Sequence, residues 1–273
     1  MSELRLPAPP GTLEALTGAP ELTMRDDQLM RYSRQVMLPE LDIAGQQRLL
    51  DAHVLLVGLG GLGAPCALYL AAAGIGCLTL VDNDQVELSN LARQIIHATP
   101  DIGKDKVTSA NESLAQLNPD CKVHTHVAAV DEENLPMLLS DVDLVVDGSD
   151  NFGTRHAVNR ACRTKGIPLV SGAAIRWEGQ VAAFDFRQPN APCYACLYPD
   201  SDSDDALNCA ENGVAAPVVG IIGAMQALEV MKLIAGVGTT LAGYVLAMDA
   251  KHQQYQRLKL ARAEQCEVCS GFD

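Results

Sequence analysis

Short apolar runs alternate with helical patterns between residues 50 and 172. The predicted strands are residues 53–57, 77–81, 121–127, 142–146 and 167–171. The predicted helices between them are residues 61–73, 104–117, 131–139 and 151–165, and Asp131 is expected to cap the third of these. Strands that alternate with helices in this way predict a parallel sheet that is covered by helices on both faces.

The pattern differs on either side of this region. Helical patterns precede it at residues 24–38 and 43–50, whereas a strand at 179–186 follows it without a helix of its own. An apolar helix at 214–234 and strands at 241–248 and 253–259 complete the chain. We therefore predict an α/β fold with a Rossmann-like, doubly wound, mostly parallel sheet and a C-terminal antiparallel extension.

The domain organisation follows from the same pattern. No linker rich in Pro, Gly or Ser separates the segments, so residues 24–273 are predicted to form a single domain. Its nucleotide-binding part is expected at about 50–172 and a second part at about 173–273. Residues 1–23 contain several prolines and no continuous apolar segment, which favours an extended or disordered arm over a signal peptide.

Residues 55–81 carry no charge and are long enough to span a membrane. Glycines cluster near both ends of this stretch, which favours a strand, a turn, a helix and a second strand, and we expect no membrane association. The net charge of −14 argues against nucleic acid as a partner. Nine cysteines without a secretory leader indicate reduced thiols and a cytoplasmic protein.

Four of the cysteines form two C-x-x-C pairs, Cys193/Cys196 and Cys266/Cys269. Two such pairs can complete a tetrahedral shell of four thiolates around one Zn²⁺, which would be structural because no ligand position stays open for water. An iron site of the same geometry, two separate dithiols and disulfides are the alternatives. Cys66, Cys77, Cys121 and Cys162 lie in or beside predicted helices and strands, and we interpret them as packing residues.

A glycine-rich loop follows the first predicted strand of the sheet. Gly58, Gly60, Gly61 and Gly63 form a G-x-G-x-x-G pattern before a helix, where backbone can approach phosphate closely. Asp82 ends the next strand, and a carboxylate there can accept hydrogen bonds from ribose hydroxyls. These features alone predict a nucleotide site, with NAD as the default ligand.

Cations behind the loop change this prediction. Arg93 and Lys106 follow the second strand, and such charges stabilise phosphates during adenylyl transfer, whereas a redox dinucleotide does not need them. Asp150 follows the strand at 142–146 and is a candidate Mg²⁺ ligand. Asn151 beside it is the candidate N-cap of the next helix.

Together these motifs resemble the MoeB/ThiF family, the bacterial relatives of ubiquitin-activating enzymes. The resemblance covers about residues 24–271 and implies a ThiF-type adenylation domain, in which residues 173–273 form the carrier-binding and zinc part. The segments that carry it are residues 31–35, 58–63, 82–87, 89–94, Lys106, Asp150-Asn151, 171–174, 192–196 and 266–269.

The resemblance implies an ATP-dependent reaction on a small ubiquitin-like sulfur-carrier protein, of the MoaD/ThiS type, that ends in Gly-Gly. The carrier's terminal carboxylate attacks ATP to give an acyl-adenylate and pyrophosphate, and sulfur from a separate donor protein then yields a thiocarboxylate. Molybdopterin synthesis, thiamine synthesis and other sulfur-containing metabolites all use this chemistry.

The resemblance also implies the residue roles. Asp82 holds the ribose, Asn90, Arg93 and Lys106 contact phosphate, and Asp150 binds Mg²⁺. The ATP contacts as a whole are Gly58, Gly60, Gly61, Gly63, Asp82, Asp84, Ser89, Asn90, Leu91, Ala92, Arg93, Lys106, Asp150 and Asn151. Arg34 is expected to reach the active site of the partner subunit, which implies a homodimer. Cys209 is a candidate for sulfur transfer, although the acidic residues just before it would not lower its pKa.

Three other functions remain open on the sequence alone. An NAD-dependent oxidoreductase with structural zinc would explain the glycine loop and Asp82, but it leaves Arg93, Lys106 and Asp150 without a role. A relative that adenylates a nucleoside of tRNA conflicts with the net charge of −14. A non-catalytic scaffold that keeps the fold would not need the full set of charged residues.

Overall fold

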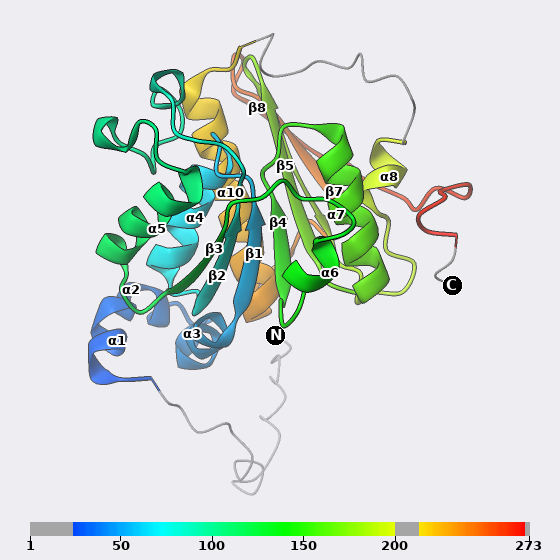
Figure 1. Ribbon diagram of the computed structural model, residues 1–273. Coiled ribbons are helices and arrows are strands. Elements are labelled where there is room, and N and C mark those ends of the chain that lie inside the picture. Colours follow the sequence, from blue (N-terminus) through cyan, green and yellow to red (C-terminus); the bar gives the residue numbers. More distant parts are fainter. Residues whose placement is uncertain (1–23, 200–212, 271–273) are drawn as a thin grey trace, which may run out of the picture.

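The computed structural model describes residues 24–199 and 213–270, and these residues build one sheet between two layers of helices (Figure 1). The strand order across the sheet is β3-β2-β1-β4-β5-β6-β7-β8. The strands are β1 (His53–Val57), β2 (Cys77–Val81), β3 (Lys122–His126), β4 (Leu144–Asp147), β5 (Leu169–Ile175), β6 (Glu178–Phe184), β7 (Tyr244–Asp249) and β8 (Gln254–Lys259).

The sheet has a parallel half and an antiparallel half. Strands β3, β2, β1, β4 and β5 run parallel, with Val54 of β1 opposite Leu78 of β2 and Leu144 of β4. Strands β5 to β8 pair antiparallel in sequence order. The predicted mostly parallel sheet with a C-terminal antiparallel extension is therefore confirmed, and both predicted parts of the chain contribute strands to it.

Two apolar clusters lie on the two faces of the sheet. Val54 and Leu56 of β1 belong to one cluster, and the alternate residues Leu55 and Val57 belong to the other, as the period of a strand requires. The first cluster is covered by α4 (Gly63–Ala73), α5 (Lys106–Leu117) and α10 (Ala216–Ala235), which share one side in Figure 1. The second lies beneath α6 (Leu135–Leu138), α7 (Phe152–Lys165) and α8 (Tyr194–Leu197).

The uncharged stretch at residues 55–81 divides as expected into β1, the glycine loop, α4 and β2. Gly74 ends α4 with φ of 92°, the left-handed conformation that favours glycine. Within the described ranges, α10 is the one helix that is long and apolar enough to cross a membrane. It packs on α4, β5 and β6 with most of its apolar window buried, as a core helix does.

Two sequence predictions near the helices were wrong in detail. The pattern at 24–38 is interrupted, so that α1 (Asp26–Arg31) and α2 (Ser33–Val36) precede α3 (Asp42–Asp51) as separate helices. The break falls at Tyr32, whose buried hydroxyl accepts a hydrogen bond from Nδ2 of Asn118 at 2.8 Å. The helix predicted at 131–139 is shorter in the structure, because α6 begins at Leu135 with Asn134 as its N-cap, and Oδ1 of Asp131 accepts hydrogen bonds from the amides of Glu133 and Asn134 in the turn that leads into it.

Candidate active site and metal centre

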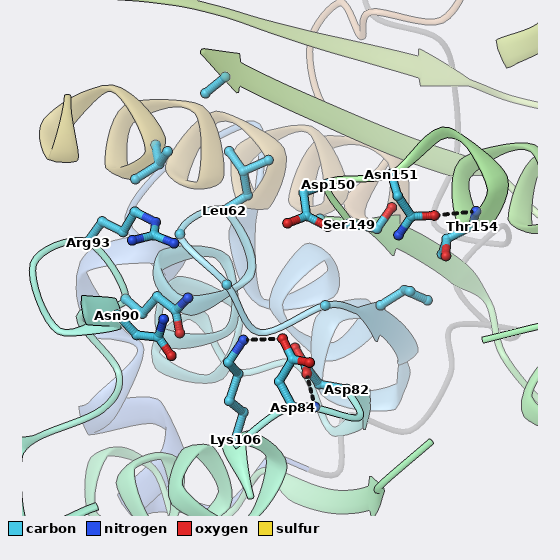
Figure 2. Close-up of a pocket in the computed structure, with 18 of the residues that line it drawn as sticks. Leu62, Asp82, Asp84, Asn90, Arg93, Lys106, Ser149, Asp150, Asn151 and Thr154 are labelled. Atoms are coloured by element: carbon cyan, nitrogen blue, oxygen red, sulfur yellow. Dashed lines mark hydrogen bonds and ion pairs between the residues drawn. The ribbon is translucent and has the colours of Figure 1, made fainter. Parts of the chain in front are cut away.

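A cavity of about 550 Å³ opens at the carboxyl ends of β1, β2 and β4. This edge is where ligands bind in open α/β sheets. The predicted residues that line the cavity are Gly58, Gly60, Gly61, Asp82, Asp84, Asn90, Ala92, Arg93, Lys106, Asp150 and Asn151. Figure 2 shows Asn90, Arg93 and Lys106 on one side of the cavity and Asp150 and Asn151 on the other.

The glycine loop between β1 and α4 is tightly closed. Gly58 has φ of +85°, and a Cβ on it would lie 3.0 Å from the carbonyl oxygen of Gly148 in the turn after β4. A Cβ on Gly63 would lie only 1.8 Å from the carbonyl oxygen of Gly58. Gly63 does not line the cavity. Position 63 instead requires a glycine because the first turn of α4 packs against the start of the loop and leaves no room for a Cβ.

Asp82 is buried beside the glycine loop. Its Oδ2 accepts a hydrogen bond from the amide of Leu59 at 2.7 Å, and its Oδ1 accepts one from the amide of Asp84 at 2.8 Å. Burial raises the pKa of the Asp82 carboxyl, while the charge of Lys106 and the two amides oppose that rise. The carboxylate therefore joins the loop to the end of β2 and faces the cavity, where a ribose could donate to it.

Lys106 is the first residue of α5 and is almost fully buried. Its Nζ lies 2.7 Å from Oδ2 of Asp84, and its backbone amide donates to the carbonyl of Asp84 at 3.0 Å. The ammonium is thus fixed at the cavity wall, in reach of an anionic ligand that enters the cavity. Lys106 and Asp84 were both predicted as ATP contacts, and both line this cavity.

The segment after β2 places the second cation. The 3₁₀ helix η2 (Leu88–Asn90) is held by Oδ1 of Asn90, which accepts from the amide of Glu87 at 3.0 Å. Arg93 follows, and its Nη1 donates to the carbonyl of Ser89 at 3.2 Å. Ser89 and Leu91 do not line the cavity, whereas Asn90, Ala92 and Arg93 do. Ser89 therefore contacts the side chain of Arg93 through its backbone carbonyl and does not face the cavity itself.

The turn between β4 and α7 carries Asp150. Asp147 before it is buried, and its carboxylate accepts hydrogen bonds from the hydroxyls of Ser149 at 2.6 Å and Ser171 at 3.0 Å. Asn151 caps α7, since its Oδ1 accepts from the amide of Thr154 at 2.8 Å, which confirms the predicted N-cap. Asp150 itself is exposed at the cavity, so its carboxylate is available to a ligand.

Three residues of the site were not singled out from the sequence. Arg155 is buried, and its Nη2 donates to the carbonyls of Ser149 at 2.6 Å and Gly172 at 3.1 Å. Gln94 is buried against the glycine loop, beside Arg93 in the recognised motif. His97 lies behind the cavity. Their signal is burial of a polar side chain, which only the tertiary structure reveals.

Arg34 is exposed on α2 and does not line the cavity of its own chain. Cys209 lies outside the described residues.

A second cavity of about 540 Å³ adjoins the first, and Asp150, Arg155 and Ala174 line both. Its floor is formed by β6, β7 and β8, and aromatic side chains of Phe152 and Tyr198 border it. The hydroxyl of Tyr198 donates to Oε1 of Gln180 on β6 at 2.9 Å. A chain that enters along this cavity would reach the first one beside Asp150.

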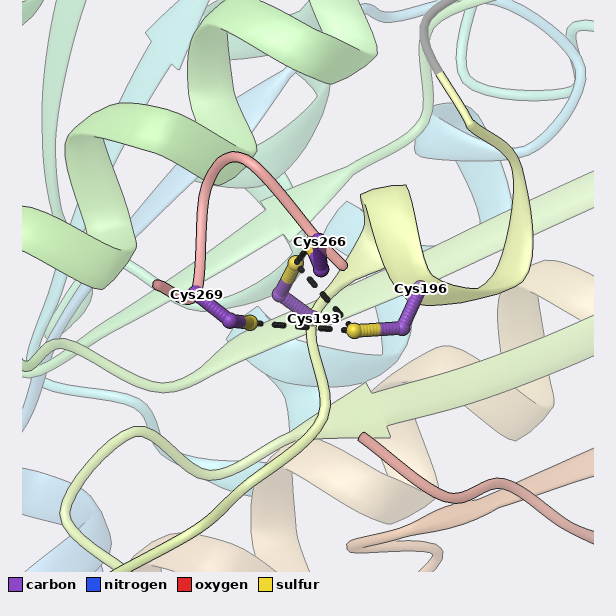
Figure 3. Close-up of side chains that lie close together, drawn as sticks. All are labelled: Cys193, Cys196, Cys266 and Cys269. Carbon is purple, nitrogen blue, oxygen red and sulfur yellow. Dashed lines mark hydrogen bonds between the residues drawn. The ribbon is translucent and has the colours of Figure 1, made fainter. Parts of the chain in front are cut away.

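The two C-x-x-C pairs come together as predicted (Figure 3). Sulfur–sulfur distances are 3.8 Å for Cys193–Cys196, 3.6 Å for Cys193–Cys266 and 3.7 Å for Cys196–Cys269, and all four atoms lie within 4.8 Å of one another. A tetrahedral Zn²⁺ with Zn–S bonds of about 2.3 Å requires sulfurs about 3.8 Å apart. The donor set and spacing therefore fit a four-thiolate site.

The surroundings of the cluster favour a thiolate at Cys196, whereas a hydrogen bond with Cys196 raises the pKa of the Cys193 thiol and burial raises that of Cys269. Hydrogen bonds from Cys193 and from the amide of Ala263, 3.4 Å from the sulfur, lower the pKa of the Cys196 thiol. By contrast, burial raises the pKa of Cys66, Cys121 and Cys162, which agrees with their interpretation as packing residues. Cys193 is the N-cap residue of α8 and Cys196 lies within this helix, and the amide of Tyr194 donates to Oδ1 of Asn159 on α7 at 2.9 Å.

Comparison with known proteins gives a consistent result. The model of the ThiF family matches residues 32–268. The molybdopterin-synthase adenylyltransferase of Salmonella typhimurium is 44% identical over 246 residues, which cover 90% of this chain and 98% of that protein. The adenylyltransferase and sulfurtransferase MOCS3 of Anopheles gambiae is 44% identical over 249 residues, which cover 90% of this chain but 56% of that protein.

Among solved structures, E. coli MccB with MccA-N7isoASN superimposes with a TM-score of 0.78 at 25% identity. The match covers 88% of this chain and 75% of MccB.

Proposed function

The chain belongs to the ThiF family, and from this membership and the site we propose that it adenylates the C-terminal carboxylate of a sulfur-carrier protein. The protein is an adenylyltransferase, the activity for which the Salmonella typhimurium relative, matched over 98% of its length, is named. The observation that carries the proposal is the pair of cations, Arg93 and Lys106, in one cavity with the exposed carboxylate of Asp150. An NAD-dependent oxidoreductase is not favoured, because its chemistry would leave these three side chains unused.

In the proposed reaction a carboxylate oxygen of the carrier attacks the α-phosphorus of ATP. The bond from that phosphorus to the oxygen that bridges to the β-phosphate breaks, and pyrophosphate leaves with the electron pair. The products are the carrier acyl-adenylate and pyrophosphate. Because the nucleophile belongs to the substrate, the enzyme contributes orientation and charge stabilisation. Lys106 and Arg93 oppose the charge that builds on the leaving phosphates.

The other residues of the cavity hold the nucleotide in this proposal. Gly58, Gly60 and Gly61 let the backbone approach the phosphates, and Asp82 accepts hydrogen bonds from the ribose. Asp150 would hold Mg²⁺, which supplies positive charge to the phosphates when it is bound. The fit rests on the exposed carboxylate of Asp150 at the cavity, in contrast to Asp84, which is paired with Lys106.

We assign the four-cysteine cluster to a structural Zn²⁺. The sulfur positions leave no open ligand position, so the ion would stabilise the fold rather than act on substrate. It would join the loop at Cys193 to the C-terminal pair, and through Tyr194 and Tyr198 it would support the second cavity. An iron site of the same geometry is separated from this assignment by metal analysis of the purified protein.

The second cavity is the proposed path for the carrier's Gly-Gly tail. An extended tail without side chains could pass between Phe152 and Tyr198 and bring its carboxylate to Asp150. The body of the carrier would then lie over β6, β7 and β8. A separate protein would donate the sulfur that displaces AMP, and Cys209 is retained as a candidate for that later step.

A homodimer is proposed from the exposed apolar side chains on the α4 and α10 side of the sheet. Tyr69 on α4 is 58% exposed and Leu228 on α10 is 55% exposed, although both helices are otherwise largely buried. Met37, next to α2, is also exposed. A second copy would cover this face and could bring Arg34 to the neighbouring cavity. We propose a cytoplasmic enzyme with one adenylation domain at residues 24–273.

ATP–pyrophosphate exchange tests the proposed function. The assay would compare the enzyme alone with the enzyme plus each small protein of the same genome that ends in Gly-Gly. Exchange that depends on one carrier is expected, and it would also identify the pathway. A matched carrier without its last glycine should support none. No exchange with any carrier, together with clear binding of NAD, would reject the proposal.

A further inference from the structure

His97 is buried at the centre of the site without lining the cavity. Its side chain connects the glycine loop to α5, because Nε2 lies 3.3 Å from the carbonyl oxygen of Leu59 and Nδ1 lies 2.8 Å from Oγ of Ser109. We propose that His97 is a positioning residue that holds the ribose-binding and phosphate-binding walls of the cavity in register. This inference rests on the proposed function and adds a residue to which no role has been assigned.

The hydrogen bonds determine the tautomer of His97. A backbone carbonyl can only accept, so the hydrogen must lie on Nε2, which donates to Leu59. Nδ1 then carries a lone pair and accepts from the hydroxyl of Ser109. Among the neutral forms of the ring, this tautomer is the one that satisfies both contacts. A side chain without both functions would break one of the two connections.

Each ring nitrogen of His97 contacts a residue that neighbours a proposed ATP contact, Asp82 on one side and Lys106 on the other. Leu59 accepts from His97 through its carbonyl, and its amide donates to Oδ2 of Asp82 at 2.7 Å. Leu59 is therefore fixed on both sides, which sets the carboxylate that would bind the ribose. Ser109 is buried one turn after Lys106 on α5, so its bond to His97 sets the start of that helix.

The charged groups around His97 agree with a neutral ring. Burial lowers its pKa, and the charge of Lys106 lowers it further, whereas the Leu59 carbonyl and the carboxylates of Asp101 and Asp82 oppose this. In a protonated ring Nδ1 would donate to Oγ of Ser109 instead of accepting from it, so this hydrogen bond would reverse. The neutral ring keeps both contacts without placing a charge in a buried position.

The test uses three variants of the full-length enzyme. His97→Phe removes both hydrogen bonds, His97→Gln keeps an N–H near the position of Nε2, and Ser109→Ala removes only the contact to Nδ1. His124→Phe is the matched control, because that histidine is exposed on β3. Calorimetry measures ATP binding without a carrier, and steady-state adenylation gives kcat and KM for ATP and for the carrier.

The proposal predicts a selective loss of nucleotide affinity. In His97→Phe the Kd and KM for ATP should rise about tenfold, which is the effect expected when a buried hydrogen bond is lost and the residues it held shift. The KM for the carrier should stay unchanged. His97→Gln should recover most of this loss, and Ser109→Ala should show a rise of about two- to fivefold. His124→Phe should match the unchanged enzyme.

Two results would overturn the role of His97. One is ATP affinity within twofold of the unchanged enzyme in a folded His97→Phe variant. The other is an equal loss in His97→Phe and His97→Gln, since a purely structural role would not distinguish the retained N–H. Failure of the unchanged enzyme to bind ATP would instead reject the proposed function, so the two failures are distinguishable.

Discussion

Lys106 and Asp84 form an ion pair of 2.7 Å in which the lysine side chain is 7% exposed and the aspartate side chain is 60% exposed. The surrounding buried residues therefore hold the Lys106 ammonium in place, whereas the Asp84 carboxylate is largely solvated. A phosphate group that enters the cavity can share the ammonium with Asp84 or take it over, because the carboxylate loses little when water replaces its partner. The pair thus keeps the cation in place for an anionic ligand.

The first prediction concerns this cation. Lys106→Met should lower kcat for adenylation by a factor of about 10² to 10³, because the leaving pyrophosphate loses a nearby positive charge. The unfolding temperature should change little, since the partner left behind is mostly exposed. Pyrophosphate release and thermal unfolding measure the two effects.

The matched control is Lys104→Met, two residues earlier in the chain. Lys104 forms surface ion pairs with Asp101 and Glu112 and does not line the cavity. This variant should keep nearly full activity. Comparable losses in both variants would indicate a general effect of charge and would refute the role assigned to Lys106.

The second prediction concerns the metal centre. Cys266→Ser should lose the bound zinc and lower the unfolding temperature by at least about 10 °C, because a four-thiolate site contributes directly to folding. The KM for the carrier should rise as well, since Tyr194 and Tyr198 join the cluster to the second cavity. Cys77→Ser is the control and should retain the metal. Full zinc retention in Cys266→Ser would show that the cluster is not the ligand set.

The third prediction concerns pH. The pKa of His97 lies below its ordinary value near 6.5, so below that pH the unfolded chain binds more protons than the folded one. The stability that the neutral ring contributes is therefore fully present above pH 6.5 and is lost as the pH falls toward the lowered pKa. His97→Gln should show a shallower fall in unfolding temperature over this range. Parallel curves for both proteins would contradict the assignment.

The fourth prediction concerns the shared active site. Arg34→Ala and Arg93→Ala should each be inactive alone, because each site needs Arg93 from one subunit and Arg34 from the other. After the two variants are mixed and allowed to exchange subunits, about half of the dimers are mixed and each holds one intact site. About a quarter of the original activity should return. Absence of recovery despite confirmed subunit exchange would place Arg34 outside the partner's site.

Local patterns predicted much of this structure. The strands at 53–57 and 77–81 are found with the predicted bounds, because each is a short apolar run between glycine or polar residues. Asp82 and the glycine loop meet as expected, since parallel strands end at the same edge of the sheet. The two cysteines of each pair also lie close together as predicted, because C-x-x-C spacing places two sulfurs on one side of a short turn.

Long-range contacts account for what the sequence did not reveal. Tyr32 breaks the first helical pattern because its ring packs against Gly74, where a Cβ would lie 2.7 Å from the ring, and its hydroxyl meets Asn118. Arg155 and His97 act through backbone carbonyls of other segments, and such acceptors have no sequence signature. Their roles follow from the tertiary structure alone.

The most direct test of the central claim is intact-mass spectrometry of the carrier after incubation with the enzyme, ATP and Mg²⁺. The proposed function predicts a carrier that has gained one adenylyl group, that loses it to added hydroxylamine, and that does not form with Arg93→Ala enzyme. A carrier of unchanged mass that nevertheless supports ATP consumption would contradict an acyl-adenylate and, with it, the proposed function.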